Sequence, residues 1–147
     1  MPRFVQATRA QSLVEFALVV PLLLILVFGI IDFGMGLSRW IVITNATREG
    51  ARLGAVGRPP AEVEAKTIAA SSGIIDSSNV IVDYQDVGAN GYAGDGGDAV
   101  VVKVTYEYNF ATPLGALLNR SSVTLSACSD MRLERGVMGI VTAGNTC

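Results

Sequence analysis

Histidine is absent from this 147-residue sequence, and cysteine and charged residues are scarce. Without histidine, the chain lacks the commonest general base and the commonest metal ligand of proteins. The two cysteines, Cys128 and Cys147, are too few to enclose a zinc ion. The 11 basic residues are outnumbered by 13 acidic residues, so the chain lacks the basic patch expected of a nucleic-acid-binding protein.

Recognisable catalytic motifs are also missing. The sequence contains no Ser-x-x-Lys, no Gly-x-Ser-x-Gly, no Walker loop and no metal-ligand spacing. Gly94, Gly96 and Ala99 match a loose dinucleotide-binding motif, but they connect two expected strands and not a strand and a helix. Asp95 and Asp98 offer oxygen ligands of the kind that calcium favours, although a flexible hairpin loop is the simpler interpretation. We therefore expect neither an enzyme nor a bound cofactor.

What the sequence does contain is one long apolar segment near the N-terminus. Residues 16–31 are all apolar, Gly or Pro, and the apolar pattern continues to Leu37. At about 1.5 Å per residue, Phe16 to Leu37 gives roughly 33 Å of helix, close to the bilayer core of about 30 Å. The segment is apolar on every face, which favours a transmembrane helix over a buried core helix. A cleaved secretory signal is the other alternative, but no A-x-A site follows the segment.

Charges around this segment predict its orientation. Arg3 and Arg9 precede it, and the first acidic residue is Glu15. The positive-inside rule then places the N-terminus in the cytoplasm and the rest of the chain outside. Glu15 itself stands at the entry to the span, where a carboxylate is costly. An acidic residue at the bilayer centre costs roughly 2.5 to 3.5 kcal/mol, and less near the edge, so Glu15 is expected to have a function.

Beyond the membrane the helix is expected to continue to about Val56. Residues 58–60, Arg-Pro-Pro, interrupt the chain, and a second helix is predicted over residues 61–72, ended by Gly73. Small side chains recur every fourth position on two adjacent rows of the first helix, which lets another element approach closely. These rows are Ala46, Gly50 and Gly54, and Thr47, Ala51 and Ala55.

After Gly73 the apolar period changes to two, which indicates strands. Alternation occurs around residues 80–85, 100–110 and 123–134, each with one apolar and one polar face. Three such strands imply an antiparallel sheet whose apolar face lies on a helix and whose polar face lies in water. The predicted fold class is therefore α+β, with a long N-terminal helix packed on a small three-stranded antiparallel sheet. On the last strand, Arg132 is expected to join its acidic neighbours in an exposed charge ladder.

The start of the sequence resembles a known processing site. Residues 9–16, Arg-Ala-Gln-Ser-Leu-Val-Glu-Phe, followed at once by the apolar span, resemble the site at which type IV prepilin-like proteins are cut. In that family a short basic leader is removed on the cytoplasmic side. A Glu is usually the fifth residue after the cut. The resemblance implies cleavage between Ala10 and Gln11, with Glu15 in the Glu position and Ala10 where the family usually has Gly.

The fuller resemblance is to TadE-like proteins, which are minor pilin or pseudopilin components of tight-adherence (Flp-type) pilus systems. It rests on residues 11–16, on Asp32-Phe33-Gly34 and on residues 45–52, with a weaker match over residues 124–134. The resemblance implies a pilin-like fold and a role in pilus biogenesis and surface adhesion. It also implies three kinds of partner: a prepilin peptidase, other pilin or pseudopilin subunits, and the pilus assembly platform.

These inferences give a domain organisation. Residues 1–10 are a leader peptide, residues 11–57 are the transmembrane and extended N-terminal helix, and residues 58–147 are an extracytoplasmic α+β domain. The protein is expected to be a single-pass protein of the inner or cytoplasmic membrane, either staying there or entering a pilus. On the oxidising side, Cys128 and Cys147 are expected to pair. Cleavage would free the amine of Gln11, and Glu15 would gain by pairing with such an amine on a neighbouring subunit.

Two other functions stay open at this point. The chain could be a stand-alone membrane-anchored module whose extracytoplasmic domain binds a ligand or an envelope component. A membrane-tethered hydrolase is the third hypothesis, against which the lack of catalytic motifs argues.

Overall fold

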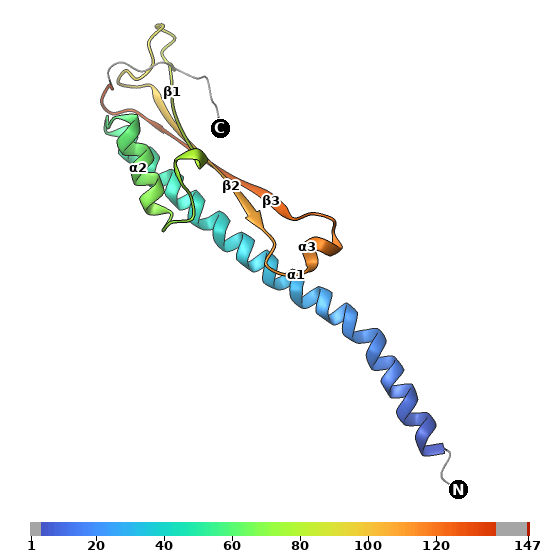
Figure 1. The fold of residues 1–147 in the computed structure, drawn as a ribbon. Coiled ribbons are helices and arrows are strands. Elements are labelled where there is room, and N and C mark those ends of the chain that lie inside the picture. The colour runs from blue at the N-terminus through green and yellow to red at the C-terminus, as the bar shows by residue number, and fades with distance from the viewer. Residues whose placement is uncertain (1–3, 138–146) are drawn as a thin grey trace. The chain divides into compact units, whose positions relative to one another are not determined.

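The computed structural model describes residues 4–137 and residue 147, with side chains from residue 11 onward. Helix α1 (Phe4–Ala55) is followed by α2 (Pro60–Ala70), a single 3₁₀ turn η1 (Ser77–Asn79), and strands β1 (Val80–Gln85) and β2 (Ala99–Asn109). The short helix α3 (Leu114–Leu117) then leads into β3 (Ser122–Arg132) (Figure 1). The chain divides into two compact units. One holds residues 1–35 with 109–122, and the other holds residues 36–108 with 123–147.

The predicted α+β class is confirmed. The three strands form one antiparallel sheet in the order β1-β2-β3, with Val80 of β1 opposite Val104 of β2. Helix α1 ends at Ala55, one residue before the predicted end. Helix α2 begins at Pro60, which suits the first turn of a helix because that turn needs no N–H donor there. An ion pair of 3.4 Å between Lys66 and Glu49 links the two helices.

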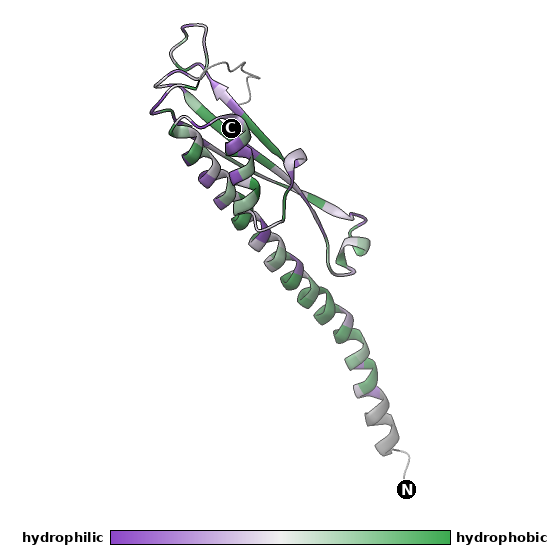
Figure 2. Ribbon diagram, turned by 60° about the vertical axis from the view of Figure 1, so that its left-hand side comes forward, coloured by the Kyte–Doolittle hydropathy of each residue, from purple (hydrophilic) through white to green (hydrophobic). Residues whose placement is uncertain are grey.

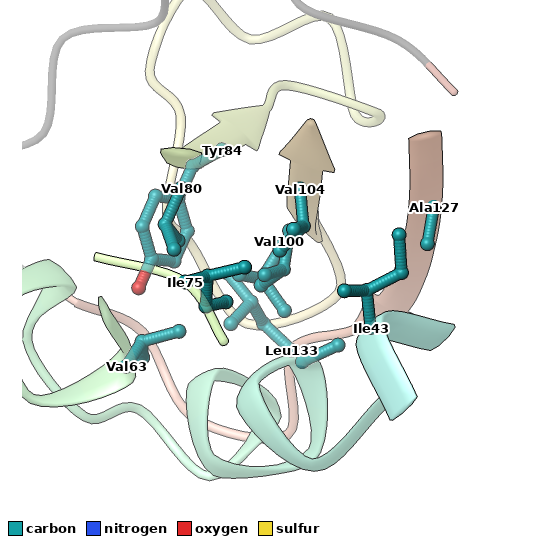
Figure 3. Close-up of a cluster of buried hydrophobic side chains, with 11 residues drawn as sticks. Ile43, Val63, Ile75, Val80, Tyr84, Val100, Val104, Ala127 and Leu133 are labelled. Carbon is teal, nitrogen blue, oxygen red and sulfur yellow. The ribbon is translucent and has the colours of Figure 1, made fainter. Parts of the chain in front are cut away.

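The core of the larger unit lies between the sheet and the helices. Figure 3 shows side chains from both helices and all three strands pointing toward one another. The apolar face predicted for the first half of β2 is confirmed, since Val100, Val102 and Val104 are fully buried. The complete cluster is Ile43, Ala51, Val63, Ile75, Val80, Tyr84, Val100, Val102, Val104, Ala127 and Leu133.

The opposite face of the sheet is not as open to water as predicted. Asp83 of β1 lies opposite Val101 of β2, and these residues are only 3% and 1% exposed. Thr105 and Glu107, further along β2, are exposed as expected. The expectation of a solvated face is therefore wrong at the Asp83–Val101 pair. Burial of the carboxylate is offset in part by a 2.9 Å hydrogen bond that it accepts from the N–H of Tyr84.

The rows of small residues on α1 are packing surfaces. A Cβ atom added at Gly54 would lie 2.8 Å from Val100 Cγ2, and one added at Gly50 would overlap the Thr67 hydroxyl. Thr67 cannot easily turn away, because its hydroxyl donates a buried 2.8 Å hydrogen bond to the carbonyl of Val63. Helix α2 and strand β2 therefore approach α1 at distances that only glycine allows.

The close approach at Gly50 gives a stability prediction. Gly50→Ala is expected to destabilise the folded domain by about 1–3 kcal/mol, because the added methyl group overpacks a closed contact. Gly36→Ala on the same helix is the matched control, since its Cβ would lie 3.8 Å from the Tyr108 ring. That change is expected to be neutral or stabilising by up to about 1 kcal/mol. Chemical denaturation of the full chain in detergent micelles measures both, and equal stability of the two variants would contradict the prediction.

Candidate membrane anchor and assembly site

The N-terminal part of α1 is an apolar surface that no other described part of the chain covers. Between Gln11 and Ala55 the helix is long and apolar enough to cross a membrane, and its most apolar stretch is entirely unburied. Figure 2 shows that the hydrophobic colour predominates along this stretch. The alternative of a buried core helix is excluded, because such a helix would have its apolar side chains covered by the rest of the chain. Helix α1 also continues without a break to Ala55.

Glu15 lies on this uncovered surface, between the exposed side chains of Val14 and Leu18. Among the residues whose side chains are described, none forms a hydrogen bond or an ion pair with its carboxylate. A carboxylate on an apolar helix surface is costly unless it finds a partner. Any partner of Glu15 therefore lies outside the described side chains.

The predicted cleavage site falls at the limit of the described side chains. Gln11 is described and exposed on α1. Ala10 and the rest of the predicted leader lie outside the residues whose side chains are described. The cleavage between Ala10 and Gln11 stays a prediction.

Asp32 is the second carboxylate of the apolar segment, and no sequence pattern predicted a role of its own for it. It is 3% exposed. Its Oδ1 atom accepts hydrogen bonds from the N–H groups of Ala111 at 2.9 Å and Thr112 at 3.3 Å. Its Oδ2 atom accepts a further bond from the Thr112 hydroxyl. Three donors thus stabilise a charge that would otherwise be costly in these surroundings, and they fasten the loop after β2 to the helix.

That loop is closed by its own backbone hydrogen bonds. The Phe110 N–H donates to the Ser121 carbonyl at 3.2 Å, and the Arg120 N–H donates to the Gly115 carbonyl at 2.9 Å. Gly115 is required at its position, since a Cβ there would lie 2.7 Å from the Arg120 carbonyl oxygen. The loop that Asp32 holds is therefore a defined structure with little room for substitution.

The loop between β1 and β2 is organised by Asp98. Its Oδ1 atom accepts hydrogen bonds from the N–H groups of Val87 and Gly88, and its Oδ2 atom accepts one from Asp95. Burial raises the pKa of this carboxyl, but the backbone donors outweigh that effect and hold the pKa below its usual value. The resulting stabilisation is present at neutral pH and is lost as the pH falls through the lowered pKa.

The oxygens of Asp98 already accept backbone N–H bonds within this loop. Asp95 accepts a hydrogen bond from the Asn90 side chain at 3.0 Å. In the described part of the chain, no three His, Cys, Asp or Glu residues gather as a metal site. Arg132 also contributes to the loop, since its Nε donates to the Gly97 carbonyl at 2.9 Å. Arg132 is exposed, as predicted, and this bond is an additional role for its side chain.

The two cysteines are joined in the structure. The Cα atoms of Cys128, on β3, and Cys147 lie 5.7 Å apart, with a bond between their sulfurs. This separation is within the ordinary range for a disulfide.

Formation of this disulfide in the cell is a prediction that can be tested directly. Mass spectrometry of a non-reduced digest is expected to find the peptides of Cys128 and Cys147 linked. Reduction is expected to lower the free energy of unfolding by about 3 kcal/mol, because the bond closes a loop of about 20 residues in the unfolded chain. The double variant Cys128→Ser, Cys147→Ser should match the reduced protein and be insensitive to reductant. Alkylation of both thiols without prior reduction would contradict the prediction.

The described architecture is of the pilin-like kind, with a long N-terminal helix, apolar in its first part, packed on a small antiparallel sheet. Residues 10–52 match the family model of TadE-like proteins, so the resemblance drawn from the sequence is confirmed over these residues. The matched stretch includes both Glu15 and Asp32. No curated protein and no solved structure matches the chain.

Proposed function

We propose that the protein is a minor pilin or pseudopilin subunit of a tight-adherence pilus system, acting in pilus biogenesis and surface adhesion. The match of residues 10–52 to the TadE-like family model supports a pilus-associated structural role. The observation that carries the finer proposal is the Glu15 carboxylate, which lies on an uncovered apolar helix without a partner among the described side chains. This arrangement suits a subunit whose helix packs against other subunits.

The mechanism follows from the chemistry of the N-terminus. A prepilin peptidase would cut between Ala10 and Gln11 and leave a free, positively charged amine on Gln11. The Glu15 carboxylate of one subunit would then pair with the Gln11 amine of a neighbour. In a low-dielectric setting, such a pair is favourable only when the charges meet in good geometry, so it would set the register between subunits. The apolar helices would pack as a filament core or as part of the assembly platform.

The proposed location is the inner or cytoplasmic membrane, with α1 as a single span. Arg3 and Arg9 place the N-terminus in the cytoplasm, and residues 58–147 would then form the extracytoplasmic domain. The bond between Cys128 and Cys147 supports an extracytoplasmic position for this domain, because disulfides persist in oxidising compartments.

Processing is the test of this function. N-terminal sequencing of the protein from its pilus-producing host is expected to begin at Gln11. Ala10→Leu places a bulky side chain before the cut and is expected to leave a larger, membrane-held precursor. Ala7→Leu, a matched change elsewhere in the leader, should be processed normally. An intact N-terminus, in cells that process their other prepilins, would contradict the proposal.

The alternative of a stand-alone binding module has one observation in its favour. Tyr92 is 74% exposed on the β1–β2 loop, where Asp86 accepts hydrogen bonds from Asn90 and Gly91. An exposed aromatic side chain on an ordered loop suits ligand recognition. An uncut leader together with a tight soluble ligand would favour this function over a pilus subunit.

A further inference from the structure

The α3 turn presents two leucines that nothing in its unit covers. Leu117 and Leu118 are 65% and 57% exposed. Their exposure does not come from a lack of local structure. The Leu117 N–H donates to the Pro113 carbonyl at 3.2 Å, and the Leu118 N–H donates to the Leu114 carbonyl at 2.9 Å. Two adjacent leucines on a closed, well-bonded turn form an apolar surface that calls for a specific neighbour.

The position of this turn along α1 identifies that neighbour. The loop is fastened to α1 at Asp32 through the N–H groups of Ala111 and Thr112. The span that the sequence predicts runs from Phe16 to Leu37, and its uninterrupted apolar run ends at Ile31. Asp32 thus lies near the outer end of this span. The loop that it holds lies at the level where the helix leaves the membrane.

The two residues that follow the leucines also suit the boundary of the membrane. Asn119 and Arg120 are exposed directly after Leu118. Apolar side chains next to an amide and a guanidinium are typical of segments that lie at the boundary between headgroups and acyl chains. The Ile31 and Phe33 side chains on α1, on either side of Asp32, are also exposed. The apolar surface of the turn and that of the span therefore occur at the same height on the helix.

We propose that α3 is a second membrane contact, in which Leu117 and Leu118 insert into the headgroup–acyl boundary of the leaflet from which α1 emerges. This inference rests on the membrane-spanning role of α1 in the proposed function. A second contact beside the span restrains the tilt and rotation of the helix relative to the bilayer.

Tryptophan quenching by brominated lipids tests the proposal. The full chain is placed in phosphatidylcholine–phosphatidylglycerol vesicles, with Trp40→Phe removing the one native tryptophan. Single tryptophans are then introduced as Leu117→Trp and Leu118→Trp at the turn, Leu22→Trp in the span, and Tyr92→Trp on the outer loop. The turn variants are expected to be quenched most by bromines near the headgroup, and Leu22→Trp by bromines near the chain ends. Tyr92→Trp should not be quenched.

Two outcomes would overturn the proposal, and they differ in what else they affect. If Leu22→Trp is quenched but both turn variants are not, the leucines do not meet lipid, while the span itself stands. A blue-shifted but unquenched emission in that case would assign the surface to a neighbouring protein subunit. If Leu22→Trp is also unquenched, the membrane-spanning role of α1 fails, and the second contact fails with it.

Discussion

Glu15→Ala is expected to leave the protein in the membrane and to abolish its assembly with other pilus subunits. The change makes the span more apolar, so insertion should persist or improve. What is lost is the carboxylate that would pair with the Gln11 amine of a neighbouring subunit. Because the described side chains offer Glu15 no partner within the chain, removing it should not affect the fold of the single subunit.

Conservative variants separate charge from shape at this position. Glu15→Gln keeps the length and volume of the side chain but removes the charge, and it should fail as completely as Glu15→Ala. Glu15→Asp keeps the charge but shortens the reach, so an intermediate defect is expected. The measurements are the amount of protein in the membrane fraction, the amount recovered with sheared pili, and adhesion of the cells. Normal adhesion by both Glu15→Ala and Glu15→Gln would remove the case for pairing.

The helices and strands could be predicted because the spacing of apolar residues is a local property of the sequence. The valines at positions 100, 102 and 104 show the apolar face of β2 without any knowledge of their neighbours. The uniform apolar character of residues 16–31 likewise indicates a membrane helix. The small residues on α1 predicted a close approach. They could not show that Thr67 meets Gly50 and that Val100 meets Gly54, since these contacts depend on how the elements pack.

The features that escaped prediction depend on contacts between distant positions or on irregular backbone. Asp32 and Thr112 are 80 positions apart in the chain, so no local pattern connects them. Asp98 holds its loop through backbone N–H groups, which every residue except proline carries and which therefore leave no trace in the sequence. The burial of Asp83 and Val101 was missed because alternation assigns a face to each residue but does not show which part of that face is covered. One signal for Asp32 was available: a carboxylate at the end of a long apolar run must find a partner.

Asp32→Ala is expected to detach the loop of residues 110–121 from the helix. The substitution removes the acceptor of three hydrogen bonds and leaves the N–H groups of Ala111 and Thr112 without their partner. Bonds to a charged group contribute about 1.5–3 kcal/mol each, and water can replace part of this at a half-exposed loop. We therefore expect a local destabilisation of about 3 kcal/mol, which corresponds to amide exchange on the order of 100-fold faster at these two positions.

Hydrogen exchange of the full chain in micelles measures this effect at single amides. Asp32→Asn retains one oxygen acceptor without the charge and should accelerate exchange less than Asp32→Ala. Thr112→Val removes only the hydroxyl donor and keeps the side-chain volume, so the two backbone bonds to Asp32 should persist. Anchoring should be unchanged in all three variants, because Asp32→Ala makes the apolar segment longer and not shorter. Unchanged exchange at Ala111 and Thr112 in Asp32→Ala would show that the loop is held by its own closure between Phe110 and Ser121, and that the buried carboxylate serves another purpose.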